Sequence, residues 1–345
     1  MKLNYHILSK YRTPLMGIAM ISIICMHYFE DLTLYFSQGT IAYAIGRSVL
    51  DVVSTFGVEI FLFLSGIGLF YSWHKKHELI PFYKKRFSRV LIPYLAIGSI
   101  FFIIYYVNRG FDPFKFFKGL FFITFFERGF RTFWYILCIM LCYLLFPFIN
   151  HFINDSHHEL RSLIGLIAAT ILFNTAIAII NPALFANIEI LLTRLPIFMI
   201  GVYFGKLVYE EKTISHKAIL FYCLCFIGAI TLRVFKTNIG LPFWGVYQRY
   251  IAALLALPTM LMFSAVLEYI SNNMMQILNF FGKHSLEIFL FHMCYRYFFR
   301  AFHLPTIYFP NECLMVALSV FTATLYSYFY TKSYQRHPLR FTFSH

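Results

Sequence analysis

Two ionisable side chains interrupt stretches of the chain that are otherwise apolar enough for a membrane. His27 lies near the end of the apolar stretch 13–29, and Glu59 lies in the next apolar stretch. An ionisable group inside hydrocarbon is costly, so it normally faces a partner or a water-filled cavity. His27 is therefore either a histidine hydrogen-bonded by a neighbouring helix, or a catalytic base or proton relay.

A pair of arginines follows the second apolar stretch at a spacing of one helical turn. Arg86 and Arg89 lie in a basic segment that is closed by Pro93. Two guanidinium groups on one helix face suit a polyanion such as a nucleotide phosphate, although they could equally be plain anchors at the cytoplasmic surface. A base that takes a hydroxyl proton, together with a bound anionic donor, would fit these residues.

Five further residues are candidates for lining a cavity between helices. Ser285 and His292 are seven residues apart and share a helix face, where they could take part in chemistry or only in hydrogen bonds between helices. Trp134 and Arg194 stand at the edges of apolar stretches, where an aromatic anchor and a snorkelling arginine are the ordinary interpretations. Ser65 precedes a glycine, and this pair permits close approach of two helices.

The sequence gives no support for covalent serine chemistry or for a metal site. It has no Ser-His-Asp arrangement, no phosphate-binding loop and no cluster of zinc-type ligands. The seven cysteines fall mostly inside apolar stretches, and we interpret them as small buried hydrophobic residues. We therefore expect no disulfide framework and no metal.

The composition indicates an integral membrane protein. Of 345 residues 60% are hydrophobic, and the mean hydropathy is +0.68, whereas ordinary globular chains are about 45–50% apolar. We predict an all-α fold, a polytopic transmembrane helical bundle formed by a single domain, residues 1–345, without an appended soluble domain. The net charge of +14 points to membrane orientation and to anionic headgroups or ligands, not to nucleic acid.

About ten membrane-spanning helices are predicted, with both termini in the cytoplasm. The basic segment after the second span places that connection inside by the positive-inside rule, which puts His27 toward the outer half. A short loop is expected between the first two spans. The Phe-rich segment 111–126 could span, re-enter or lie on the membrane. The predicted spans are residues 13–29, 52–73, 90–107, 133–149, 163–180, 190–209, 218–235, 251–267, 286–299 and 314–330.

Taken in order, these motifs resemble the acyltransferase-3 family of integral membrane acyltransferases, which modify cell-surface glycans. The resemblance covers nearly the whole chain, and the order of the motifs is more specific than any one of them. The stretches that carry it are the first span ending in His27, the stretch 57–66 ending in Leu-Ser-Gly, Arg86 and Arg89 with Pro93, Trp134, the stretch 194–201 and the stretch 285–292.

The resemblance implies an acyl-CoA, commonly acetyl-CoA, as a cytoplasmic co-substrate and a glycan or glycolipid hydroxyl as the acceptor. The expected location is the bacterial cytoplasmic membrane, with the lipid bilayer as the remaining partner. His27 is then expected to be the general base, with Glu59 as a second catalytic residue. The family usually has a basic residue eleven positions before this histidine, where this chain has Met16, and Arg12 is expected to replace it. The residues expected to hold the donor are Arg12, Arg86 and Arg89.

Two other classes of protein would fit some of these features. A flippase or transporter for lipid-linked glycans would bind an anionic headgroup without chemistry, and it would not consume acyl-CoA. A membrane glycan polymerase should need large outer loops, and the loops predicted here are small.

Overall fold

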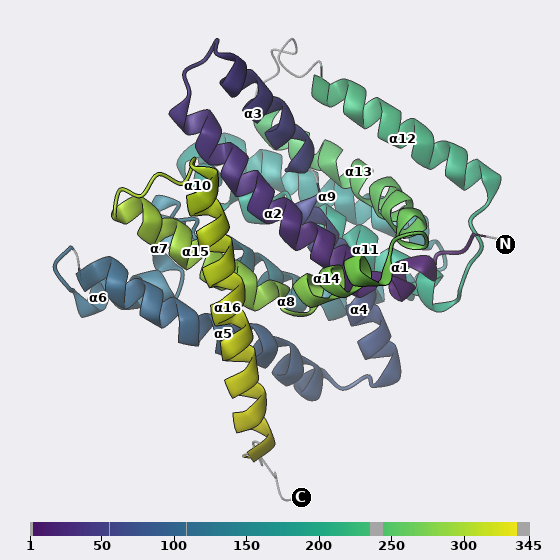
Figure 1. Ribbon diagram of the computed structural model, residues 1–345. Helices are drawn as coiled ribbons and strands as arrows, with labels where there is room; N and C mark the ends of the chain where they lie inside the picture. Colours follow the sequence, from purple (N-terminus) through teal and green to yellow (C-terminus); the bar gives the residue numbers. More distant parts are fainter. Residues whose placement is uncertain (1–2, 55, 108, 235–243, 337–345) are drawn as a thin grey trace, which may run out of the picture.

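The computed structural model describes residues 3–54, 56–107, 109–234 and 244–336, and these residues form helices without a named strand (Figure 1). The predicted all-α class is therefore confirmed. In chain order the helices are α1 (Ile7–Lys10), α2 (Arg12–Tyr35), α3 (Ile41–Val53), α4 (Gly57–Lys75), α5 (Leu79–Val107), α6 (Pro113–Leu120), α7 (Ile123–Arg128), α8 (Trp134–Asn154), α9 (Glu159–Ile180), α10 (Pro182–Leu192), α11 (Leu195–Tyr209), α12 (His216–Val234), α13 (Trp244–Leu267), α14 (Asn272–Lys283), α15 (Ser285–Ala301) and α16 (Phe309–Arg336).

Eight segments of the described chain are long and apolar enough to cross a membrane. They confirm the polytopic prediction, whereas the number of ten spans and the side of each terminus remain predictions. The two other predicted spans are also helical but shorter, namely the apolar part of α12 and the 17-residue α15. The end of the predicted span 218–235 and residue 55 of the predicted span 52–73 lie outside the described residues.

Two connections between predicted spans contain short helices. The expected loop after the first span is wrong, because α2 continues to Tyr35 and α3 follows, with Thr40 accepting a hydrogen bond from the Tyr43 N–H at 3.2 Å. The segment 111–126 forms most of α6 and α7, which have 8 and 6 residues. A helix of that length rises only about 12 Å, so neither can cross about 30 Å of hydrocarbon alone.

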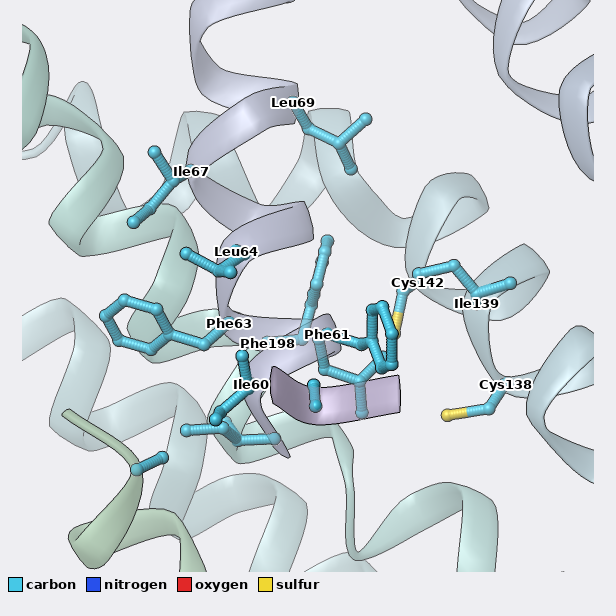
Figure 2. Packing of buried hydrophobic residues seen from close by; sticks show 14 of the residues in the cluster. Ile60, Phe61, Phe63, Leu64, Ile67, Leu69, Cys138, Ile139, Cys142 and Phe198 are labelled. Atoms are coloured by element: carbon cyan, nitrogen blue, oxygen red, sulfur yellow. The ribbon is translucent and has the colours of Figure 1, made fainter. Parts of the chain in front are cut away.

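Helix α4 forms the centre of the hydrophobic core. Its apolar residues lie on all sides, as expected of a helix that other helices surround, and Ile60, Leu62 and Phe63 are completely buried. Figure 2 shows Cys138, Ile139 and Cys142 of α8 beside α4. On its α11 side the backbones nearly touch, because a Cβ at Gly201 would collide with the backbone of Phe63.

Helices α2 and α14 also pack backbone to backbone. A side chain at Gly282 would collide with the carbonyl oxygen of Thr13, and one at Gly17 would collide with the carbonyl oxygen of Leu278. In Figure 1, α2 runs through the middle of the molecule and α14 lies beside its first half. This contact brings the end of α14 and the start of α15 next to the first turn of α2.

The outer faces of the bundle carry large apolar side chains. In α9 and in α16 only 17% of the most apolar 18-residue stretch is buried. Side chains such as Ile180 and Phe321 are therefore left exposed to the surrounding lipid. All seven cysteines are free. The expectation that they are buried holds for Cys138, Cys142 and Cys294 but is wrong for Cys223 and Cys313, which lie on exposed faces of α12 and α16.

Candidate active site

A cavity of about 530 Å³ lies between α2, α4, α5, α8, α14 and α15. Its volume falls within the range of about 300–1,000 Å³ that is typical of small-molecule sites. Most of the predicted site residues, from five of these helices, line this one cavity, and so does Met16. The predicted residues in its wall are Arg12, His27, Ser65, Arg86, Arg89, Trp134 and Ser285.

One part of the cavity wall is strongly cationic. Arg12 at the start of α2, Arg86 and Arg89 on α5 and Lys283 at the end of α14 all line it, and Glu287 is the single carboxylate among the described lining residues. Four cations against one carboxylate create a positive potential that favours an anionic ligand.

Two arginines in this wall, Arg12 and Arg86, are half-buried and retain unused donors. Arg86 Nη2 donates to the carbonyl oxygen of Gly68 at 3.4 Å, and the Arg12 guanidinium packs on the same glycine, where a Cβ would collide with it. The Nε atoms of Arg12 and Arg86 are buried and have no hydrogen-bond partner within the described chain. Since a buried donor without a partner costs free energy, a bound anion would stabilise this arrangement.

His27 lies further along α2 and is only 8% exposed. Its Nδ1 atom lies 3.2 Å from Nε2 of His292 on α15, and the two rings are nearly parallel, at 8° and 5.2 Å between centroids. His27 also lines the cavity, whereas His292 is fully buried behind it. Because His292 occupies the Nδ1 side of His27, Nε2 is the ring nitrogen left for a ligand.

A second contact between α2 and α15, one helical turn further along, was missed by the sequence analysis. Arg296 Nη2 lies 2.5 Å from Asp31 Oδ1 and 2.6 Å from Glu30 Oε2, and it also donates to the His27 carbonyl oxygen at 3.4 Å. Thr306 Oγ1 donates to Asp31 Oδ2 at 2.5 Å. The sequence contains one signal for this contact. Asp31 follows His27 by four residues, and Arg296 follows His292 by the same spacing.

Glu59 and Arg194 lie outside the described cavity wall and form an ion pair with each other. Glu59 is 1% exposed, and its second carboxylate oxygen is buried without a hydrogen-bond partner in the described chain. The guanidinium carbon of Arg194 lies 5.9 Å from the ring centroid of Trp134, whose ring lines the cavity. The pair therefore supports the wall through Trp134.

The fold and the cavity together are those of an integral membrane protein with an internal cavity whose wall is partly cationic. The model of the acyltransferase-3 family, described as an acyltransferase domain, matches residues 15–331. The chain therefore belongs to this family, as predicted, and it is a membrane acyltransferase. Comparisons with curated proteins and with solved structures found no match.

Proposed function

We propose that this protein transfers an acyl group, expected to be acetyl, from cytoplasmic acyl-CoA to a hydroxyl of a cell-surface or lipid-linked glycan. The setting proposed is the bacterial cytoplasmic membrane. The single observation that carries the proposal is that Arg12, Arg86, Arg89 and His27 line one cavity. Anion-binding groups and a candidate base thus share a space of about 530 Å³ between membrane helices.

The donor would enter with its diphosphate at the arginines. Fifteen residues separate Arg12 from His27 on α2, which corresponds to about 22 Å at 1.5 Å per residue. An extended pantetheine arm can largely bridge such a distance, so its thioester would come near His27. Charge-assisted hydrogen bonds from the guanidinium groups to phosphate oxygens would fix this orientation.

Transfer of the acceptor hydroxyl proton to His27 requires one particular tautomer of His27 and one of His292. If His27 accepts a proton at Nε2, its Nδ1 carries the hydrogen and donates to Nε2 of His292. His292 then carries its own hydrogen on Nδ1, and its Nε2 lone pair stabilises the imidazolium that forms on His27. His292 is thus a positioning residue for His27.

The reaction follows from these positions. The acceptor oxygen attacks the thioester carbonyl carbon while His27 takes the hydroxyl proton. The carbon–oxygen bond forms, the carbon–sulfur bond breaks, and the proton passes from His27 to the thiolate of the departing CoA. The ordinary pKa of imidazole, about 6.5, suits a group that must take and return a proton near neutral pH.

The test uses purified protein in vesicles with labelled acetyl-CoA and a lipid-linked glycan. Label should appear on the glycan, with release of one CoA thiol for each acetyl group transferred. The alternative, a flippase without chemistry, would move the glycolipid and leave acetyl-CoA intact. Mass spectrometry of surface glycan from cells with and without the protein should show a difference of one acyl group.

A further inference from the structure

A second cavity of about 350 Å³ lies beside the first, between the end of α4 and the start of α5. Arg86 lines both cavities, so this residue belongs to the wall of each. The remaining residues in the wall of this second cavity are Tyr71, Ser72, Lys75, Lys76, Glu78, Pro81, Phe82 and Lys85.

The second cavity is cationic. Lys76 pairs with Glu78 at 3.1 Å, which accounts for the one carboxylate in its wall. Within the described chain no carboxylate pairs with Lys75 or Lys85, so two ammonium groups remain available beside Arg86. Such an arrangement favours a ligand with more than one negative charge.

The same wall also contains two aromatic residues, of which Tyr71 is half-buried and Phe82 packs against Trp73 and Phe146. Phe82 is buried, and its ring centroid lies 6.0 Å from the guanidinium carbon of Arg86. Tyr71 lies on the α4 side of the cavity. An aromatic side chain such as Tyr71 next to cations suits a ligand that combines a flat heterocycle with phosphates, which is the composition of a phosphorylated nucleoside.

We propose that the second cavity binds the phosphorylated adenosine end of acyl-CoA, with the diphosphate at Arg86 and the ribose phosphate at Lys75 and Lys85. This inference rests on the proposed function, because it assigns the remainder of the same donor. A pantetheine arm that extends from Arg86 toward His27 leaves its nucleotide on the opposite side of Arg86, where this second cavity lies.

The test compares two donors in the double variant Lys75→Gln/Lys85→Gln. The KM for acetyl-CoA should rise about tenfold or more, since two contacts between charges and a phosphate are removed. The kinetic constants for S-acetylpantetheine, which lacks the nucleotide, should match those of the unaltered protein. Lys84→Gln is the matched control, because Lys84 is exposed on the same helix but does not line the cavity, and both donors should be used normally.

A binding measurement tests the cavity independently of acyl transfer. Purified protein should bind adenosine 3′,5′-bisphosphate, and the double variant should bind it about tenfold more weakly. Equal binding by the two proteins would overturn the proposal. The double variant could instead lose the same activity with both donors, to an extent that depends on the anionic lipid content of the vesicles. That result would also overturn the proposal, because the lysines would then contact lipid headgroups. If neither the unaltered protein nor its variants transferred acetyl groups, the proposed function would fail. The binding measurement would still show whether the second cavity binds the nucleotide.

Discussion

Nε2 of His292 lies 3.2 Å from Nδ1 of His27 and thereby determines which nitrogen of His27 is left for a ligand. One helical turn further along, Arg296 meets Asp31 at 2.5 Å. Both contacts join residues that are 265 positions apart, so α2 and α15 are held in one register by two successive pairs. The register places the ring of His27 in the cavity wall.

The first prediction concerns His292 as a positioning residue. His292→Ala should lower kcat about 10- to 100-fold, as when a metal-bound imidazole loses the partner that orients it, with an unchanged KM for acyl-CoA. His292→Gln should retain more activity, since its amide oxygen can still accept the hydrogen bond from Nδ1. A normal kcat in His292→Ala, or a raised KM with a lowered melting temperature, would contradict this role.

The second prediction concerns the buried ion pair. Asp31→Asn leaves the guanidinium of Arg296, which is 8% exposed, without its buried partner, and breaking such a pair typically costs about 3–5 kcal/mol. The melting temperature of the protein in detergent should fall by several degrees. Glu30→Gln is the control, because its half-exposed carboxylate contributes little to stability. Equal melting temperatures for both variants would show that Asp31 does not stabilise the contact between α2 and α15.

Hydropathy predicted most of the fold because lipid-facing helices such as α9 and α16 must be apolar over their whole length. It missed α3 and α14, since a short helix with polar residues lacks the long apolar stretch that marks a span. The division of the predicted span 190–209 between α10 and α11 follows from Pro196, which suits the first turn of a new helix.

The candidate site was predictable only in part. Residue type and spacing identified His27 and the cationic side chains, because an ionisable group in an apolar stretch stands out. The partners were not visible, since a contact between residues 265 positions apart leaves no local pattern. Asp31 and Arg296 lie near the ends of apolar stretches, where charged residues are ordinary. Glu59 was singled out correctly as buried, but its pairing with Arg194 could come only from the fold.

The third prediction concerns the close contact of α2 with α14. Gly282→Ala should destabilise the protein by about 1–3 kcal/mol, because the new methyl group meets the backbone carbonyl of Thr13, which cannot move aside alone. Gly165→Ala on α9 is the matched control, since nothing lies within 4 Å of its added Cβ. The control should be neutral or slightly more stable, because alanine favours the helix. Similar melting temperatures in the two variants would mean that α14 can shift freely.

The fourth prediction concerns the cation at the start of α2. Arg12 and Met16 line the same cavity, one turn apart, although the family usually has its basic residue at the position of Met16. Arg12→Gln should lower kcat/KM for acyl-CoA about 10- to 100-fold, and Arg12→Gln/Met16→Arg should recover part of the loss. Full activity in Arg12→Gln would show that no cation is needed on this face.

The most direct test of the account is acyl transfer by His27→Gln. Glutamine keeps much of the shape and a hydrogen-bonding group but cannot take a proton, and loss of a general base typically lowers the rate by about 10²–10⁴-fold. The measurement is transfer of label from acyl-CoA to glycan by purified variant protein whose amount, membrane insertion and melting temperature match those of the unaltered protein. The account predicts almost no labelled glycan with His27→Gln. Transfer at most of the normal rate would contradict it, because His27 would then serve only to hold α2 against α15.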